Sequence, residues 1–579
     1  MKQAFIFLGL FWVGSAIMLS PSQLASAFAE TTKVSLSVLT KGMVFQRVAM
    51  VALGAATIAI GFLVDSNRSE SQEQNPAPST SAANLEKTPW GWLTAVIAVA
   101  LILRLIQLNS DLWYDEVVTL VESVRLPFDQ LLMTYTSPNN HILFTIFAKF
   151  CTNLFGESPW SMRLPALIAG MGSLAALYWV GLKITDSRIT LLATSLVAVS
   201  YHHIWFSQNA RGYTGMLLLT LIGTGLFLEG LRRREPKIWL AYALVLALAM
   251  YTHLSAVFAF MGHGIIFLAI LFGYRVGRHH RFFRSLVRPF PAAVDFWPLI
   301  GFGFGLLIVM QFYAILAPQI VHEFASRAGP GSGHAKVAEW TNPIWTGLEI
   351  FKSLDLSQKS LVALLLCGIL CIAGYLNLLL KKPVIAMLIV VNIPITLAAL
   401  LLINFHIWPR YFFVNIGFIA IVIVNGAFVV GRYIEHHFPP IHRFRPNFPV
   451  VSYAITLFVI LASICTLPKN YRTPKQDFTG ARDYIESVRN AQDTVAAVGI
   501  SAYPYQNLYA PSWHAVSTPM ELETDQKKQP YTWLVYSFPT YMKGAHPEML
   551  NYIANHYELK KEFPASLGDG TIYVWKTRK

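Results

Sequence analysis

Charged residues are scarce in this sequence. Only 13% of the 579 residues are Asp, Glu, Lys or Arg, and 54% are hydrophobic, whereas a soluble globular protein carries about a quarter charged residues. Several apolar runs are long enough to cross ~30 Å of hydrocarbon. The short alternating segments of a membrane β-barrel are not visible. The composition therefore predicts a polytopic α-helical membrane protein.

Cysteine is also scarce. The chain has four cysteines, all of them within apolar runs: Cys151, Cys367, Cys371 and Cys465. Cys367 and Cys371 share a helix face, but no second pair of metal ligands lies nearby. Small core residues are the favoured interpretation. The residues after Cys465 have no disulfide framework.

A folded basic module is missing, although the net charge is +14. The densest basic runs, Arg232–Arg234 and residues 275–288, lie between apolar spans. Positive charge in such loops marks the cytoplasmic side and attracts anionic lipid. The sequence thus predicts membrane lipids as partners and no nucleic acid.

The chain divides into segments of different composition. Residues 1–29 have the features of a secretory signal peptide or of a first transmembrane helix. Residues 30–89 contain an extra span, 43–64, and then a polar stretch, 65–89, that is typical of a disordered cytoplasmic linker. Residues 90–466 hold the remaining spans, for about 12–14 apolar helices in all.

The composition changes again over residues 467–579. Periodicity predicts helices at 477–490 and 547–556 and strands at 494–499, 532–538 and 571–576. A segment of about 110 residues has the usual size of one domain. We therefore expect a small α/β domain outside the membrane.

The basic loops predict the orientation. If each faces the cytoplasm, the loop 110–141 and the segment 467–579 lie outside the plasma (inner) membrane of a multi-pass protein. Residues 141–155 do not fit the alternation, because they would leave and re-enter on one face. A re-entrant or tilted element and a miscounted neighbouring span are both open explanations.

Two adjacent carboxylates, Asp115 and Glu116, stand where the apolar span 90–108 leaves the membrane. Charge at that level is by default a functional-site candidate. One carboxylate could accept a proton from an attacking hydroxyl. The alternative is an ordinary hydrated charge at the interface, next to the interfacial aromatics Trp113 and Tyr114.

His141 begins the next apolar stretch at the same membrane level as Asp115. It could bind a metal, donate to a phosphate or cap a helix, and for an isolated histidine capping or hydration is the commoner case. His202 and His203 have no partner at zinc-site spacing.

Three arginines stand on the outer side, which should be poor in positive charge: Arg163, Arg211 and Arg410. Arg211 lies in the motif Ser207–Tyr213, and its planar fork of donors suits a phosphate. Snorkelling to lipid headgroups is the alternative. An anionic lipid-phosphate substrate would explain all three.

With these residues placed, the sequence resembles the membrane-integral GT-C glycosyltransferases. It is most similar to the bacterial polyprenyl-phosphate-dependent family of protein O-mannosyltransferases and aminoarabinose transferases. The similarity covers roughly residues 90–430 and the opening of the tail at Pro474, and residues 1–89 lie outside it. Ile142 and Leu143 replace two prolines that the family often has after the histidine. The motifs that carry it, in order, are Trp113–Glu116, Asn140–His141, Gly156–Pro165, Ser207–Tyr213 and Pro409–Tyr411.

The resemblance implies an inverting transfer of a hexosyl or pentosyl group from a polyprenyl-phosphate donor to an acceptor hydroxyl. The acceptor would be a glycan, a lipid or a protein on the outer face. Asp115 would be the general base, and no cofactor is required, although a divalent metal occurs in some relatives. Substrate binding would fall to Glu116, His141, Arg163, Arg211, Tyr213 and Arg410.

A polytopic transporter or lipid-linked-sugar flippase without transferase chemistry is the alternative function. Transporters usually show repeated halves and ionisable groups at mid-membrane, and no internal repeat is visible here. A third alternative is an envelope scaffold whose tail binds glycan, for which Asp115 would be dispensable.

Overall fold

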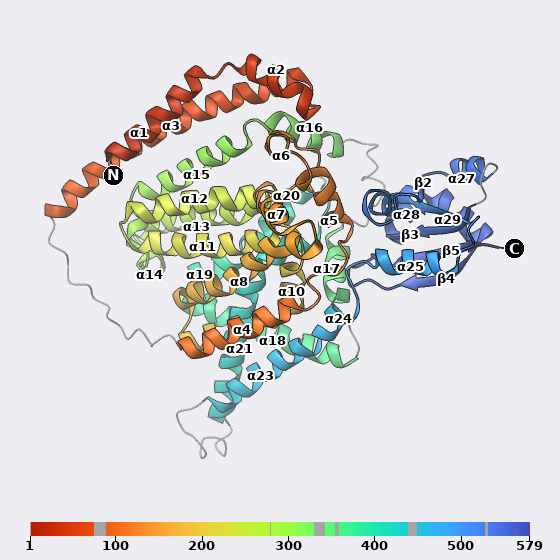
Figure 1. Cartoon of the computed structure of the whole chain (residues 1–579). Helices are drawn as coiled ribbons and strands as arrows, with labels where there is room; N and C mark the ends of the chain where they lie inside the picture. Colours follow the sequence, from red (N-terminus) through yellow and green to blue (C-terminus); the bar gives the residue numbers. More distant parts are fainter. Residues whose placement is uncertain are drawn as a thin grey trace.

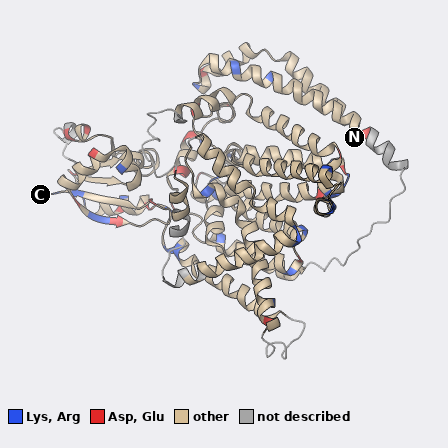
Figure 2. Ribbon diagram, turned by 180° about the vertical axis from the view of Figure 1, so that it is seen from behind, with Lys and Arg blue, Asp and Glu red and all other residues tan. Residues whose placement is uncertain are grey.

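The protein consists of a large helical bundle with a small sheet domain at one end (Figure 1). This computed structural model describes residues 2–73, 89–277, 279–328, 342–353, 358–403, 405–437, 449–526 and 531–578. Charged residues are sparse along the helices of the bundle and more frequent on the small domain (Figure 2). The surface of the bundle therefore suits the lipid bilayer, and that of the small domain suits water.

Among the described residues, eight helices are long and apolar enough to cross a membrane, or up to eleven if each of three bent pairs is one span. This confirms the polytopic α-helical prediction. The eight spans are α3 (Leu36–Glu73), α8 (Pro159–Ile184), α11 (Tyr213–Arg232), α13 (Ala256–Gly277), α18 (Gln358–Lys381), α19 (Pro383–Val390) with α20 (Asn392–Leu402), η5 (Pro409–Asn415) with α21 (Ile416–His437), and α23 (Val450–Cys465) with α24 (Leu467–Arg472).

The three bent pairs turn sharply at a short break. The angles are 77° between α1 (Lys2–Met18) and α2 (Pro21–Thr32), 62° between α9 (Ser187–Ala198) and α10 (Tyr201–Ser207), and 83° between α15 (Trp297–Tyr313) and α16 (Ala317–Ala328). Three further apolar helices are shorter: α4 (Trp90–Leu105), α7 (Ile142–Phe155) and α12 (Pro236–Thr252). The predicted total of 12–14 is reached only if these short helices are included.

Small residues bring neighbouring helices of the bundle into backbone contact. Gly374 of α18 faces Val422 of α21, and Gly426 of α21 faces Leu370 of α18. A methyl group on either glycine would overlap a carbonyl oxygen of the other helix. Close approach of this kind is how helices associate where no hydrophobic effect drives them together.

The segment 141–155, which did not fit the predicted alternation, forms the helix α7. Its 14 residues span ~21 Å at 1.5 Å per residue, short of the ~30 Å of hydrocarbon. It ends at Gly156, whose φ of +83° lies in a region that glycine adopts without steric cost. The short helix α7 leads directly into the long helix α8.

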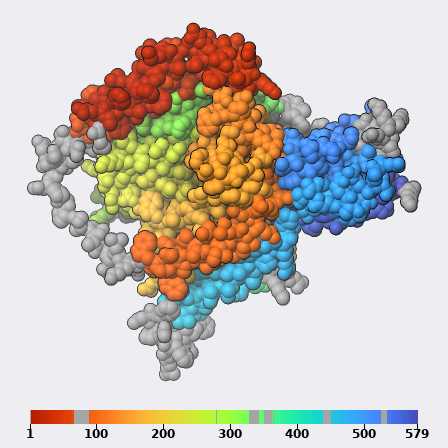
Figure 3. All heavy atoms as spheres, in the orientation of Figure 1, coloured from red at the N-terminus to blue at the C-terminus, as the bar shows by residue number. Residues whose placement is uncertain are grey.

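The first three helices form a layer on the outside of the bundle (Figure 3). Helix α1 packs along α3, with Gly9 against Gly54, and Lys2 pairs with Asp65 at 3.0 Å. Helix α3 continues to Glu73, so the predicted disordered linker 65–89 does not begin at residue 65. Residues 74–88 of that segment lie outside the described part of the chain.

The small domain is a five-stranded sheet in the order β2-β1-β3-β5-β4. β1 (Thr494–Val498) is parallel to β2 (His514–Val516) and to β3 (Tyr531–Tyr536), and β5 (Ile572–Thr577) is antiparallel to β3 and β4 (Tyr557–Phe563). In register, Ala497 lies opposite Val535, and Leu534 opposite Trp575. β1, β3 and β5 confirm the three predicted strands.

Helices cover both faces of this sheet, so the inner strand β1, which lies between β2 and the central strand β3, is buried on both sides. Val495 and Ala497 face one core, and Ala496 and Val498 face the other. The predicted helices are confirmed as α25 (Phe478–Val488) and α29 (Pro547–His556). Two shorter helices, α27 (Pro519–Gln526) and α28 (Pro539–Ala545), were not predicted.

Candidate active site

The loop that joins α4 to α7 folds into short helical turns. Residues Tyr114–Thr119 form α5, Leu120–Val124 a π-helical turn, and Phe128–Met133 the helix α6. A π turn inside a helix is frequent at functional sites. The loop is anchored to the bundle by Trp113, whose indole Nε1 donates to Asn209 at 3.0 Å. Asp115 therefore lies in the first turn of an anchored helix.

The structure brings together Asp115, Arg211 and Arg410, which are far apart in the sequence. Arg410 Nη1 donates to Asp115 Oδ2 at 3.1 Å, and Arg211 Nη2 lies 4.0 Å from the same oxygen. The Asp115 side chain is 15% exposed and that of Arg211 only 3%. With two guanidinium groups for one carboxylate, the cluster carries excess positive charge and suits an anion.

Each of the two arginines has one buried donor nitrogen without a hydrogen-bond partner among the described residues. These donors are the Nε atoms of Arg211 and Arg410. Arg211 Nη1 donates to Thr119 Oγ1 at 2.9 Å and to the carbonyl of Asn139 at 2.5 Å. An unsatisfied buried donor is costly and calls for an explanation. A ligand oxygen would satisfy both.

His141 stands beside this cluster as a neutral, nearly buried ring. Its Nδ1 accepts a hydrogen bond from the Gly212 amide at 2.8 Å, and its Nε2 lies 3.2 Å from Arg211 Nη2. Burial, reinforced by the positive charge of Arg211, holds the pKa of His141 well below its usual value. The Gly212 bond assigns the remaining proton to Nε2. Two donors then lie side by side, which again favours a ligand acceptor that both can reach.

Gly212 is required for this arrangement. A Cβ at that position would lie 2.7 Å from the carbonyl of Thr252 and 3.1 Å from His141 Nδ1. The next residue, Tyr213, is buried with its ring 5.3 Å from His141 and 5.0 Å from His253. Burial lowers the pKa of His253 to about 3, so this ring is also uncharged.

Glu116 and Arg163 also meet in the structure, where they form a buried ion pair with each other. Both side chains are fully buried, and the guanidinium grips the carboxylate through two bonds of 2.9 and 2.6 Å. Arg163 also donates to the carbonyls of Leu108, Ser110 and Asp111, and Glu116 accepts from the amides of Trp113 and Ala210. The pair therefore ties the loop to α8, and the substrate contacts expected of both residues from the sequence stay a prediction.

The charge state of Glu116 follows from this pairing. Burial alone would raise the pKa of the carboxyl, but the charge and hydrogen bonds of Arg163 outweigh it, and the pKa lies below its usual value. Glu116 is thus an anion with a dedicated partner.

Two residues at the opening of the C-terminal segment bind the bundle beside the site: Gln476 contacts the loop between α4 and α7, and Lys475 contacts Gln208 at the end of α10. Lys475 Nζ donates to the Gln208 carbonyl at 2.6 Å, and Gln476 Oε1 accepts from the Tyr114 amide at 2.9 Å. Lys475 is buried, which, together with the nearby charge of Arg163, lowers its pKa to about 7. Only their place in the tail opening Pro474–Asp477 could have marked them.

Tyr114 also meets the domain through its ring. The ring centres of Tyr503 and Phe538 lie 6.4 and 6.1 Å from that of Tyr114. Phe538 has φ = +58°, a left-handed conformation that is uncommon for a bulky residue. Such conformations persist only where the surrounding structure imposes them, and they cluster at functional sites.

Among the described residues, no group of three or more His, Cys, Asp or Glu side chains could hold a metal ion. His141 and His253 are close, with ring centres 4.3 Å apart. Arginines, however, surround this pair. The described residues thus build a cationic cluster and no metal cage.

Part of the chain matches a protein-family model. Residues 139–286 match the family model described as dolichyl-phosphate-mannose-protein mannosyltransferase. This segment includes His141, Arg163, Arg211 and Tyr213, and the match confirms there the resemblance to membrane glycosyltransferases of the mannosyltransferase type. No curated protein matches the sequence.

Several solved structures have a similar overall shape, all with TM-scores below 0.5. The oligosaccharyltransferase of Archaeoglobus fulgidus tethered with an acceptor peptide is 10% identical, with a TM-score of 0.46 over 84% of this chain and 74% of that one. ArnT from Cupriavidus metallidurans bound to undecaprenyl phosphate is 11% identical, with a TM-score of 0.44 over 84% and 98%. Arabinosyltransferase EmbB from Mycobacterium smegmatis is 14% identical, with a TM-score of 0.41 over 76% and 46%.

Proposed function

We propose that this protein transfers a sugar from a polyprenyl-phosphate-linked donor to an acceptor hydroxyl on the outer face of the plasma membrane. The observation that carries the proposal is the cluster of Asp115 with Arg211 and Arg410, in which both arginines retain a buried Nε donor without a partner among the described residues. This geometry suits a carboxylate base beside a phosphate site. The family match over residues 139–286 supports the reaction class.

In the protein alone, Asp115 is the anion that Arg410 holds. A phosphate entering the cluster would compete for the guanidinium groups and release the carboxylate. Asp115 would then accept the proton of the acceptor hydroxyl as that oxygen bonds to C1 of the sugar. The C1–O bond to phosphate breaks on the opposite face of C1, which inverts the anomeric configuration.

The arginines contribute most when the bond breaks. Negative charge grows on the departing phosphate, and fixed guanidinium groups stabilise it more strongly in the transition state than in the bound donor. His141, neutral with its proton assigned to Nε2, would donate a further hydrogen bond to the phosphate. Glu116 and Arg163 act as positioning residues that hold the turn bearing Asp115.

The basic loops support the proposed orientation. Lys183, Arg232 and Lys382 gather at one end of the bundle, where Arg232 approaches the Lys183 carbonyl at 3.4 Å and Lys382 binds that of Ile184 at 2.7 Å. The C-terminal domain lies at the other end (Figure 1). By the positive-inside rule the domain and Asp115 face outward.

The proposal is tested in reconstituted vesicles with radiolabelled sugars on polyprenyl phosphate. The expected result is label in a glycosylated product whose anomeric centre, followed by NMR, is opposite to that of the donor. A flippase would instead move intact donor across the bilayer without cleaving it. Translocation of intact donor without product would reject the transferase.

A further inference from the structure

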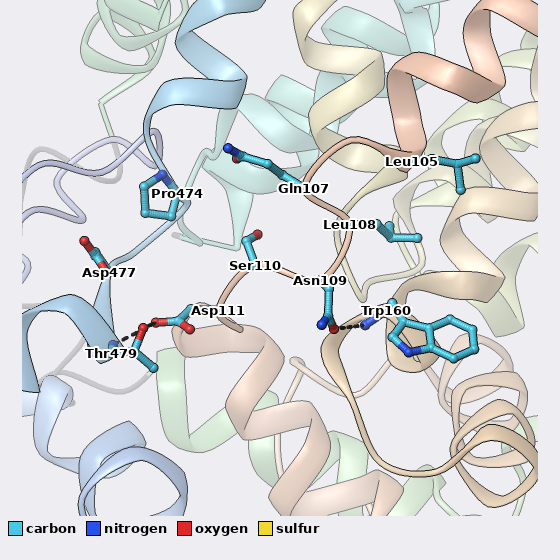
Figure 4. A pocket seen from close by; sticks show the side chains of 10 residues that line it. All are labelled: Leu105, Gln107, Leu108, Asn109, Ser110, Asp111, Trp160, Pro474, Asp477 and Thr479. Atoms are coloured by element: carbon cyan, nitrogen blue, oxygen red, sulfur yellow. Dashed lines mark hydrogen bonds between the residues drawn. The ribbon is translucent and has the colours of Figure 1, made fainter. Parts of the chain in front are cut away.

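An open surface cavity lies between the loop that joins α4 to α7 and the opening of the C-terminal segment (Figure 4). Its volume is about 700 Å³, within the range of small-molecule sites. Asp115, Arg211 and Arg410 do not line it. The residues that line it come from the end of α4 and the following loop, from the start of α8 and from the C-terminal segment: Leu105, Gln107, Leu108, Asn109, Ser110, Asp111, Trp160, Pro474, Asp477 and Thr479.

The charge of this cavity is opposite to that of the arginine cluster. Its lining contains two carboxylates, Asp111 and Asp477, and no lysine or arginine. A phosphate or an acidic glycan would meet only like charge there. The lipid-phosphate end of the donor therefore fits the arginine cluster and not this cavity, which suits an uncharged or cationic ligand.

The polar groups of the cavity could bind neighbouring hydroxyl groups of a ligand, because they offer both acceptors and a donor. Asp111 Oδ2 accepts from the amide and hydroxyl of Thr479 at 2.8 and 2.9 Å, and Asp477 Oδ1 from the Gly480 amide at 2.9 Å. The second oxygen of each carboxylate stays available as an acceptor among the described residues. Asn109 Oδ1 accepts from the Trp160 amide at 3.3 Å, which leaves the side-chain NH2 of Asn109 as a donor.

Apolar surface completes the lining. The side chains of Trp160, Leu105 and Leu108 lie on one side of the cavity, and the acidic groups lie on the other (Figure 4). An aromatic ring offers a flat apolar face beside hydrogen-bonding groups. Sugars present the matching combination, since their rings have apolar C–H faces and hydroxyl edges.

We propose that this cavity binds an uncharged or amino sugar of the acceptor, which rests on the transferase function proposed above. The cavity and the base share one loop, because Asp111 lies four residues before Asp115. Arg163, which also binds Glu116, donates to the carbonyl of Asp111 at 2.7 Å. The loop that joins α4 to α7 thus presents the acceptor sugar on one segment and the base on the next.

The test compares Trp160→Leu and Asn109→Leu with the wild type, and uses Trp90→Leu, an exposed tryptophan outside the cavity, as the matched control. Transfer of labelled sugar to the acceptors of native membranes should fall about tenfold in the two cavity variants, the scale of losing one central binding contact. Binding of polyprenyl phosphate to the purified proteins in nanodiscs should not change. Unchanged transfer, or an equal loss of polyprenyl-phosphate binding, overturns the proposal.

A binding measurement separates this inference from the transferase function. Saturation-transfer NMR in nanodiscs would use maltotriose, mannotriose, chitotriose and the chitosan trimer as free sugars, and dihexosyl diacylglycerol as a membrane-bound one. At least one probe should receive saturation from the wild type and from Asp115→Asn, and lose it in Trp160→Leu. A signal from the glycolipid alone would identify a lipid acceptor, and no signal from any probe overturns the proposal even if transfer occurs.

Discussion

The adjacent carboxylates Asp115 and Glu116 have opposite surroundings. Glu116 is fully buried in a two-bond ion pair with Arg163, and each hydrogen-bonding group of that arginine has a partner. Asp115 is partly exposed and lies between Arg410 and Arg211. The Nε donors of both arginines have no partner among the described residues. A saturated buried pair fixes structure, whereas an unsaturated cluster has capacity for a ligand.

The largest effect on stability should follow from breaking the ion pair of Glu116 with Arg163. Glu116→Gln leaves the Arg163 charge buried without a counter-ion, and we expect a loss of about 3–5 kcal/mol of stability. Thermal unfolding of the detergent-purified protein measures the loss, with Asp129→Asn in the same loop as the control. Equal melting of Glu116→Gln and the control would show that the pair is not structural.

The sequence was most informative where the signal is local. Apolar length predicted the bundle, and alternation predicted β1, β3 and β5. The short strand β2 and the edge strand β4, with its five exposed central residues, carry no such signal and were missed. The continuation of α3 beyond residue 65 was missed because polar residues in a helix read as linker.

The site was partly predictable for the same reason. Charge at an interface marked Asp115, Arg211 and Arg410 as unusual, and the structure brings the three together. The pairing of Glu116 with Arg163 spans 47 residues, and the contact of Gln476 with Tyr114 spans 362. Such contacts arise only when the chain folds, so composition and periodicity do not reveal them.

The next effect sharpens the role of the unsaturated cluster. Arg211→Lys keeps the charge but removes the planar fork, including the unpartnered Nε and the bond to Thr119. We expect the dissociation constant for polyprenyl phosphate to rise more than tenfold, with little change in melting temperature. Titration of the lipid into nanodiscs measures it.

A matched control for that variant is Arg125→Lys, on the same loop but paired with Glu157 at 2.7 Å. Its lipid affinity should equal that of the wild type. If both lysine variants bind the lipid equally well, the arginine cluster is not the phosphate site.

The smallest effect concerns the pH dependence of stability. It arises from Lys475, the C-terminal residue that donates to the Gln208 carbonyl. Because burial lowers the pKa of Lys475 to about 7, the unfolded protein binds more protons between pH 7 and about 10, and this lysine makes stability rise with pH there. Lys475→Met removes the charge, so the variant should be more stable than the wild type at pH 6, and the difference should shrink by pH 9. Melting curves at several pH values measure it.

The exposed Lys543 supplies the control for this comparison. Lys543→Met should melt in parallel with the wild type at every pH. A constant difference between Lys475→Met and the wild type from pH 6 to pH 9 would contradict the assigned titration.

The most direct test of the central claim is sugar transfer by Asp115→Asn beside Asp129→Asn, at equal abundance in membranes. The base substitution keeps the size of the side chain but removes its ability to take a proton, so transfer should fall by about 10²- to 10⁴-fold while the control retains activity. Wild-type rates in Asp115→Asn would contradict the account and move the base elsewhere.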